Sequence, residues 1–278
     1  MQAMQTAISV ESSVESEQAS GPHGLGFKGF PMRRFFGVDI SVLRRDEAIE
    51  FCLHRLAWRK STAIAFANAN LLMHCRRDPT LSEQLRDMLV LNDGVGADLA
   101  SWVLHGSAFP ENLNGTDFLP ALLTRLPEGT KVFLYGAEPQ VAERAADILA
   151  DRFPVEVCGW RHGYIADDGR VAAAIDKVGA DVVLVALGNP RQERWVSENF
   201  ADLAAPLVIS VGAFLDFQSG RVSRAPGWMR RIRFEWVYRL LMEPNRLRRR
   251  YTVDVVQFLF AVGVERLHRK PSEVSYAK

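Results

Sequence analysis

Apolar runs that end abruptly in glycine and polar residues recur along this chain, and the clearest begins at Asp181. Residues 182–187 are apolar without alternation, and Gly188, Asn189 and Pro190 follow directly. Such a run, rich in β-branched residues, is typical of a parallel strand covered on both faces. Pro190 suits the first position of a helix, because its missing N–H would have no partner there. The pattern predicts a strand, a turn and a helix, and the turn is either a ligand site or an ordinary connection.

The remaining apolar pattern predicts an alternation of strands and helices. Strands are expected at 34–40, 61–66, 88–92, 131–135, 154–158 and 207–211, and helices at 44–59, 118–125, 139–152 and 171–178. Two shorter helical pieces begin at Leu71, with a break at Asp78–Pro79. Ser41 is expected to cap the first helix, and Thr116 or Asp117 the helix from Phe118. The alternation predicts an α/β fold with a Rossmann-like parallel sheet flanked by helices.

Glycine and polar residues gather where the predicted strands end. Gly136–Ala137, His162, Asn189 and Gly212 all follow strands whose carboxyl ends meet at one edge of a parallel sheet. A helix that begins just after Gly136 or Pro190 would point backbone N–H groups and its positive dipole end at that edge, which favours phosphate. Taken singly, Asp93–Gly94 is also a turn signal, Asn68 a capping residue and His162 a structural histidine. Their convergence predicts a ligand site.

Composition excludes several classes of protein. The 278 residues carry a net charge of +1, so the chain as a whole offers no electrostatic argument for nucleic acid. Its three cysteines are far apart and form no Cys-x-x-Cys pair, which suits a reducing cytoplasm and argues against a disulfide scaffold or a zinc site. Residues 1–26 lack the apolar core of a secretory signal, and residues 253–264 are too short and too polar to span a bilayer.

Four segments are expected. Residues 1–33 are expected to form a disordered N-terminal segment, 34–128 a smaller N-terminal α/β lobe, 129–220 a Rossmann-like lobe, and 221–278 a basic helical tail. Residues 221–250 contain ten arginines against two glutamates, a net charge of +8. Two apolar stripes accompany this charge: Met229, Ile232, Trp236 and Leu240, then Leu247, Tyr251, Val255, Phe258 and Val262. The pattern fits a helix lying on an anionic membrane, or a solvated face packed back on its own domain.

Seven sequence blocks, in this order, resemble the WecG/TagA/CpsF family of bacterial glycosyltransferases, and the resemblance runs from about Phe36 to Tyr251. The blocks are Asn68-Ala69-Asn70, Asn92-Asp93-Gly94-Val95-Gly96, Gly115-Thr116-Asp117, Gly188-Asn189-Pro190-Arg191-Gln192-Glu193-Arg194-Trp195, Gly212-Ala213-Phe214-Leu215-Asp216, Arg224-Ala225-Pro226, and Glu235-Trp236-Val237-Tyr238-Arg239-Leu240 with Glu243-Pro244-Asn245-Arg246-Leu247.

The resemblance implies an enzyme that transfers a sugar from a UDP-sugar to a polyprenyl-diphosphate-linked glycan, in exopolysaccharide or other cell-surface polysaccharide synthesis. It further implies peripheral attachment to the cytoplasmic face of the bacterial membrane, and an inverting reaction without an essential metal or other cofactor. The sequence is consistent with a reaction that needs no metal, because it contains no Asp-x-Asp pair to hold a divalent ion on the diphosphate. Backbone N–H groups and arginines would then neutralise the leaving UDP.

The same resemblance implies that the lobe 34–128 binds the acceptor and carries the catalytic base, and that the lobe 129–220 binds the UDP-sugar. Asp93 is then the general base that takes the proton of the attacking acceptor hydroxyl. Partial desolvation is expected to raise its pKa, unless proton transfer is concerted with attack. Asn68 would orient the acceptor or the donor sugar, and Gln192 would contact the donor. The other expected substrate-binding residues are Gly136, Ala137, His162, Asn189, Glu193 and Gly212 around the nucleotide, Asp216 at the uridine or ribose, Thr116 and Asp117 in their block, and Arg224, Arg239 and Arg246 over the diphosphate.

One departure from the family pattern leaves the sugar open. Where relatives often carry Arg-Val-x-Gly, this chain has Asn112-Leu113-Asn114-Gly115, which removes a cation near the expected site. Family members use N-acetylmannosamine, its uronic acid or glucose. Two alternative functions are a nucleotide-dependent oxidoreductase and a non-catalytic membrane-surface adaptor. The turn after residue 135 lacks the Gly-x-Gly-x-x-Gly fingerprint that the oxidoreductase would need. Pairing of an apolar tail helix with a second subunit also stays open, and no RNA-type aromatic motif accompanies the arginines.

Overall fold

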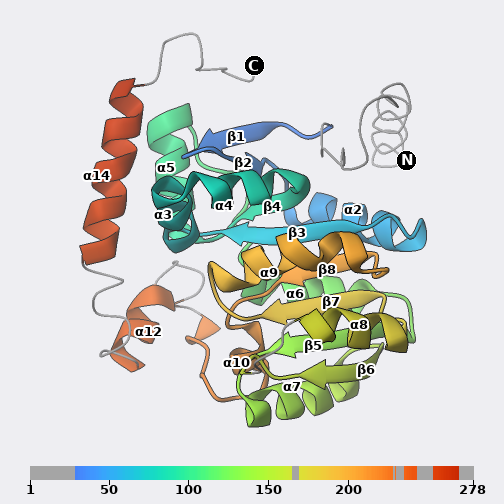
Figure 1. Cartoon of the computed structure of the whole chain (residues 1–278). Coiled ribbons are helices and arrows are strands. Elements are labelled where there is room, and N and C mark those ends of the chain that lie inside the picture. Colours follow the sequence, from blue (N-terminus) through green and yellow to red (C-terminus); the bar gives the residue numbers. More distant parts are fainter. Residues whose placement is uncertain (1–28, 165–168, 228, 230–234, 243–252, 269–278) are drawn as a thin grey trace, which may run out of the picture.

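The computed structural model describes residues 29–164, 169–227, 229, 235–242 and 253–268, and its centre is a six-stranded parallel sheet (Figure 1). The strands lie in the order β4-β3-β8-β7-β5-β6, and every neighbouring pair is parallel. Their bounds are Thr62–Ala67 (β3), Met88–Asn92 (β4), Thr130–Gly136 (β5), Val155–Arg161 (β6), Val182–Ala186 (β7) and Leu207–Ser210 (β8). The predicted α/β class with a Rossmann-like sheet is confirmed.

Both faces of the sheet are covered by helices, and two apolar cores result. One face packs α2 (Arg45–Ala57), α6 (Gly115–Arg125), α7 (Pro139–Arg152) and α10 (Phe214–Gln218). The other packs α3 (Ala69–Arg77), α4 (Pro79–Gln84), α5 (Gly94–His105), α8 (Gly169–Val178), α9 (Arg191–Asn199) and α14 (Val253–His268). Every residue of β3 and of β7 is buried, which is why their sequences show no alternation.

At the middle of the sheet, the helices that follow neighbouring strands lie on opposite faces. Helix α10, which follows β8, lies on one face. Helices α3 and α9, which follow the two neighbours β3 and β7, lie on the other. Such reversals open a crevice outside the carboxyl ends of the strands, where ligands of open α/β sheets bind. The sheet thus places its crevice among the ends of β3, β8, β7 and β5.

The N-terminal part of the fold differs from the prediction. The expected strand at 34–40 is a hairpin of β1 (Met32–Phe35) and β2 (Val38–Ser41), which pair antiparallel. Phe36 and Gly37, both with positive φ, form its turn. Ser41 belongs to β2, and the N-cap of α2 is Arg44. The apolar run concealed the turn, because a phenylalanine occupies one of its two positions.

Four further elements differ from expectation. Helix α5 was not predicted, because Gly94 and Gly96 are typical of turns. Asn114 is the N-cap of α6, so Thr116 and Asp117 lie in its first turn. Pro190 is the N-cap of α9 and not its first residue, and β6 extends past the predicted end to Arg161. Two 3-10 helices, η2 (Leu85–Asp87) and η3 (Phe200–Asp202), complete this part.

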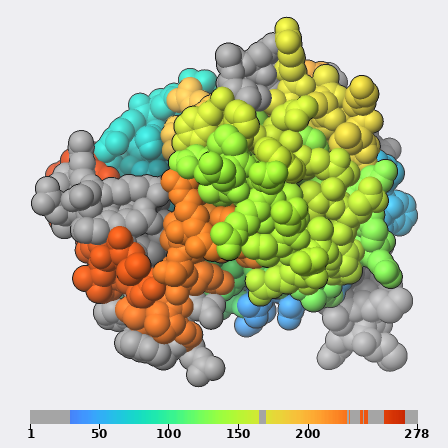
Figure 2. Space-filling model, turned by 90° about the horizontal axis from the view of Figure 1, so that it is seen from below, coloured from blue at the N-terminus to red at the C-terminus, as the bar shows by residue number. Residues whose placement is uncertain are grey.

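The six-stranded sheet contains strands from both predicted lobes, because β3 of the lobe 34–128 pairs with β8 of the lobe 129–220. After β8 the chain runs along α7, and Figure 2 shows this segment in orange against the green surface. It leads to α12 (Glu235–Met242), and α14 then packs on α5 and α3. Within the described residues, no helix combines the length and the apolar character needed to cross a membrane.

The predicted second apolar stripe is only partly exposed. Phe258 and Val262 are buried against the domain, and Val255 is at the border of exposure. Ile232 of the first predicted stripe lies outside the described residues, as do Leu247 and Tyr251 at the start of the second. One side of α14 therefore packs on the domain, while Val256, Leu259 and Phe260 of the same helix are exposed.

Candidate active site

Asn68 and Asp93 meet where the neighbouring strands β3 and β4 end. Asn68 caps α3 by accepting a hydrogen bond from Leu71 N at 3.1 Å, and its Nδ2 donates to Asp93 Oδ2 at 3.3 Å. Asp93 is the N-cap of α5, and its backbone N–H donates to Ala67 O at 3.0 Å. Both side chains are half-buried. The two residues are held in place as the N-caps of α3 and α5, and the bond from Asn68 orients the carboxylate of Asp93 at this edge of the sheet.

A loop before α6 supports the same corner. Asn112 Oδ1 accepts from Gly94 N at 2.8 Å, Leu113 N donates to Asn92 O at 3.1 Å, and Asn92 Nδ2 donates to Glu111 O at 2.9 Å. Asn112 stands at the arginine position of the family's Arg-Val-x-Gly pattern. Here the shorter side chain holds the first turn of α5 through Gly94. Sequence reasoning noticed the lost cation but not this structural role.

Arg224 ties the segment after β8 to the start of α6. Its Nη2 donates to Asp117 Oδ1 at 2.7 Å and its Nη1 to Thr116 O at 3.1 Å. Asn114 completes the cluster, because its Oδ1 accepts from Asp117 N at 3.0 Å and from Thr116 Oγ1 at 2.7 Å. The structure therefore brings Arg224 to Thr116 and Asp117, two predicted site residues that lie more than 100 positions earlier in the sequence. In this arrangement the arginine is engaged with protein groups.

The turns after β5, β6 and β7 are joined by backbone contacts. Gly136 has φ +127°, and a Cβ there would lie 2.3 Å from Ala186 O, so only glycine fits. Ala137 N donates to Ala186 O at 2.9 Å, and Gly163 N donates to Ala137 O at 2.9 Å. His162 Nδ1 accepts from Tyr164 N at 3.2 Å. The predicted convergence of these strand ends is real, and it depends on close backbone approach.

Gln192 bridges the turns of two neighbouring strands. Its side chain is buried, and Oε1 accepts from Gly188 N at 3.2 Å and from Gly212 N at 3.0 Å. Its Nε2 donates to Glu193 Oε1 at 2.7 Å. Gln192, which was expected to contact the donor, thus uses its side-chain amide to hold the turns after β7 and β8 in position. Periodicity gave no sign of this role, because the second partner lies 20 residues away.

Glu193 is a carboxyl group in the interior of the protein. It is fully buried, and Oε1 also accepts from Asn189 Nδ2 at 2.8 Å. Its Oε2 has no hydrogen-bond partner among the described residues. Burial raises the pKa of Glu193 to about 7, and the bonds from Gln192 and Asn189 only partly offset this. Glu193 is thus buried behind the turn of Gly188 and Asn189, and half-buried Asn189 joins it to that turn.

Backbone N–H groups at the strand ends were expected to contact phosphate, and several of them have partners within the protein. The N–H groups of Ala137, Gly188 and Gly212 all donate within the protein. They shape the crevice and are not directed at a ligand. Charge on a bound diphosphate would then fall to arginine side chains and to other N–H groups at this edge.

The remaining predicted residues lie on the segment after β8 or beyond it. Asp216 in α10 is half-buried and lies 3.6 Å from Arg221, which forms an ion pair of 2.7 Å with Glu138 at the N-cap of α7. Arg239 belongs to α12, and its side chain is not among those described. Arg246 lies outside the described residues. Arg221 and Glu138 were not predicted, although they hold this segment to the donor side of the sheet.

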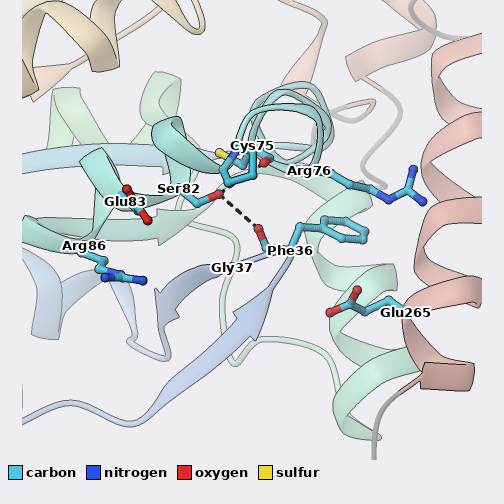
Figure 3. A pocket seen from close by; sticks show the side chains of 9 residues that line it. Phe36, Gly37, Cys75, Arg76, Ser82, Glu83, Arg86 and Glu265 are labelled. Atoms are coloured by element: carbon cyan, nitrogen blue, oxygen red, sulfur yellow. Dashed lines mark hydrogen bonds between the residues drawn. The ribbon is translucent and has the colours of Figure 1, made fainter.

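A surface cavity of about 260 Å³ lies away from this edge (Figure 3). It is lined by Phe36 and Gly37 of the hairpin turn, by Cys75, Arg76, Pro79, Ser82, Glu83 and Arg86, and by Glu265 of α14. Ser82 Oγ donates to Phe36 O at 3.2 Å, a bond that closes one wall. None of the predicted site residues lines it, so it is a seam between α14, the hairpin and α3–α4.

Comparison with known proteins gives consistent matches. Residues 33–272 match the glycosyl transferase WecG/TagA/CpsF family. The N-acetylglucosaminyldiphosphoundecaprenol N-acetyl-beta-D-mannosaminyltransferase of Bacillus spizizenii is 31% identical over 223 residues, which cover 79% of this chain and 86% of that protein. The enzyme of the same name from Bacillus subtilis is 34% identical over 167 residues, which cover 59% of this chain and 64% of that protein.

Proposed function

This chain belongs to the WecG/TagA/CpsF family and is a glycosyltransferase, and we propose that it transfers a sugar from a UDP-sugar to a polyprenyl-diphosphate-linked acceptor. Both relatives are named as N-acetylmannosaminyltransferases that act on N-acetylglucosaminyldiphosphoundecaprenol. UDP-N-acetylmannosamine and that acceptor are therefore the first substrates to test. A role in exopolysaccharide or another cell-surface polysaccharide follows from the same proposal. Family membership also removes the oxidoreductase and the non-catalytic adaptor as explanations of the site.

The single observation that carries the proposed chemistry is the hydrogen bond between Asn68 and Asp93. In the proposed reaction an acceptor hydroxyl oxygen attacks the anomeric carbon, its proton passes to the Asp93 carboxylate, and the bond from that carbon to UDP breaks with inversion. Asn68 Nδ2 fixes one carboxylate oxygen and so orients the base. General-base catalysis of this kind contributes about 10²–10⁴-fold to rate.

The donor side of the proposed site is the edge formed by the ends of β8, β7 and β5. Neighbouring strands lie about 4.8 Å apart, so the ends of β4 and β7 are separated by roughly 14 Å. That span exceeds the few ångströms between the attacking and leaving oxygens of one displacement. The UDP-sugar would therefore extend along the edge, with its sugar toward Asp93 and its uridine toward Gly188. Because the N–H groups of Ala137, Gly188 and Gly212 donate within the protein, we assign the diphosphate to other N–H groups at this edge and to arginines, and to no metal ion. The arginines are Arg239, Arg246 and Arg224, and Arg224 contacts the diphosphate by exchanging its bonds to Thr116 and Asp117.

We further propose that the enzyme works at the inner face of the bacterial membrane. A polyprenyl chain keeps its acceptor in the bilayer, while a UDP-sugar is water-soluble. The excess of arginine in residues 221–250 suits an anionic surface, to which each basic residue near the surface contributes about 1 kcal/mol. Removal of residues 221–278 should therefore lower binding to anionic liposomes. Equal binding by the shortened chain would refute this assignment of the tail.

The experiment that tests the proposal pairs donor binding with turnover. Wild type should be protected from thermal unfolding by UDP or by a UDP-sugar in a saturable manner, because a ligand that binds only the folded state stabilises it. Asp93→Asn should keep this protection and lose turnover by about 10²-fold or more. No protection of the wild type would remove the donor site, and unchanged turnover of the variant would remove Asp93 from the mechanism.

A further inference from the structure

The outer face of α5 is apolar, although the helix lies at the surface. Val95, Leu99 and Trp102 are exposed, and their spacing of four and then three residues places them on one side of the helix. The opposite side, with Ala97, Ala100 and Leu104, is buried in the core. A tryptophan with 63% of its surface exposed, in line with two exposed aliphatic residues, is not needed for the core.

A second apolar stripe lies on α14, which packs directly on α5. Val256, Phe260 and Leu267 are exposed, while Phe258, Ala261 and Val262 face the domain. Close packing is possible because residue 96 is glycine: a Cβ there would lie 3.0 Å from Ala69 Cβ and 3.7 Å from the Phe258 ring. Leu259 is exposed as well. Two neighbouring helices thus carry exposed apolar stripes, and large exposed apolar surfaces mark binding sites for proteins or membranes.

The α5 stripe begins beside the proposed base. Asp93 is the N-cap of α5, and Val95 lies in its first turn. At 1.5 Å per residue, Leu99 lies about 9 Å and Trp102 about 14 Å farther along the helix axis than Asp93. An amphipathic helix in a bilayer interface buries its apolar face by about 5–10 Å. A helix lying at that depth would keep Asp93 at the level of the headgroups, where a lipid diphosphate is located.

We propose that α5 and α14 form a membrane-docking surface, in which Val95, Leu99, Trp102, Val256, Leu259 and Phe260 enter the lipid interface and bring Asp93 to the acceptor diphosphate. The occupant is a phospholipid bilayer. The inference deepens the proposed function and relies on it for the acceptor's polyprenyl chain. It assigns the membrane contact to the catalytic domain itself, whereas the basic segment 221–250 supplies electrostatic attraction.

Two features of the chain favour lipid over a second copy of the chain. Tryptophan is enriched at the membrane–water interface, where its ring lies at the headgroup level. The second feature is segment 221–250, whose net charge of +8 lies just before α14 in the sequence. On α14 itself, Asp254 and Glu265 offset the charge of Arg266. Basic residues beside an apolar helical face are the pattern of helices that lie on anionic membranes.

The chain offers a matched control for Trp102. Trp58, at the end of α2, has the same exposed fraction of 63%. It precedes β3 and so lies toward the amino-terminal edge of the sheet, whereas Asp93 follows the carboxyl end of β4. Its ring contacts Lys60 and His54. Trp58→Ser removes an equally exposed indole from the other edge of the sheet.

The test is flotation of the purified full-length chain with vesicles of phosphatidylglycerol and phosphatidylcholine in equal amounts. Leu99→Ser with Trp102→Ser should reduce vesicle partitioning by roughly tenfold or more, since each side chain loses a large apolar area from the interface. Trp58→Ser should partition like wild type. Circular dichroism and thermal unfolding establish that each variant is folded.

Activity gives the second readout. With an undecaprenyl-diphosphate acceptor in vesicles, the double variant should transfer sugar about tenfold more slowly than wild type, while with a short-chain, water-soluble acceptor both should be equal. Partitioning equal to wild type would overturn the proposal, and so would conversion of a wild-type dimer to a monomer without change in partitioning. If wild type transfers sugar to neither acceptor, the proposed function fails, and flotation still decides the docking surface.

Discussion

The buried carboxyl of Glu193 makes a quantitative prediction about stability and pH. In the folded protein its pKa is about 7, against a reference value of 4.5 for a glutamate in water. Between these values the folded state holds a proton that the unfolded state has released, so stability falls as pH rises. The difference of about 2.5 pKa units corresponds to about 3 kcal/mol at 1.36 kcal/mol per unit. This contribution is complete below pH 4.5 and is lost as pH rises through 7.

Glu193→Gln is the variant that isolates this effect. Glutamine keeps an oxygen that accepts from Asn189 and Gln192, and it does not ionise. Its amide hydrogens replace Glu193 Oε2, which has no partner among the described residues, so the variant carries a pH-independent cost of about 1–3 kcal/mol. The informative quantity is therefore the slope with pH and not the stability at one pH. Relative to the variant, wild type should lose about 3 kcal/mol between pH 4.5 and pH 8.

Urea unfolding followed by tryptophan fluorescence measures this slope, because Trp195 lies in the same helix and packs on Tyr135 with ring centroids 4.8 Å apart. Glu198→Gln changes an exposed carboxyl of that helix and serves as the matched control. A wild-type minus Glu193→Gln difference that stays within about 1 kcal/mol across this pH range would refute the reasoning, since it would mean that burial does not disfavour the ionised form.

Three further predictions concern the turn, the C-terminal helix and the thiols. Gly136→Ala should cost at least about 3 kcal/mol of unfolding free energy in chemical denaturation, because its Cβ meets Ala186 O, whereas Gly129→Ala, also at positive φ but in open space, should cost about 1–2 kcal/mol. Phe258→Ala should cost about 3–5 kcal/mol or release α14 to protease, and Phe260→Ala, exposed on the same helix, should do neither. Burial raises the pKa of Cys52 to about 12, so a thiol reagent at neutral pH should modify half-buried Cys158 first and Cys52 only on unfolding; early Cys52 labelling would contradict this.

The sequence predicted the sheet because parallel strands covered on both faces leave a strong signal. Apart from β6, which contains Glu156 and is mostly half-buried, the strands from β3 to β8 are apolar runs that end in glycine or polar residues. Each strand was placed within a few residues. The hairpin and α5 were missed for opposite reasons. At α5 a local turn signal outweighed the helical pattern, and at the hairpin the turn signal was absent. Gly94 has φ +85°, as a turn residue would, yet it also begins a helix. At the hairpin the turn contains Phe36, a residue type that turns seldom use.

The site was predicted as a set of strand ends, and that part followed from sheet geometry. The roles of individual side chains did not follow, because they depend on partners distant in sequence. Gln192 joins Gly188 to Gly212, Arg224 joins the segment after β8 to Asp117, and Asn68 reaches Asp93 across two strands. No periodicity encodes such pairings. The burial of Glu193 is equally hidden, since a glutamate in the first turn of a helix is usually a solvated residue.

The place of β8 between β3 and β7 has a consequence for biosynthesis. About 140 residues separate β3 from β8, and at roughly 5–20 residues per second the ribosome makes the second strand on the order of ten seconds after the first. Until then, β3–β4 and β5–β6–β7 each lack the neighbour that joins them, and the inner edges of β3 and β7 have unpaired backbone groups. The last strand made is the one that unites the sheet. A nascent chain that stalls before Leu207 therefore presents two open strand edges, which are the surfaces that chaperones must shield from aggregation.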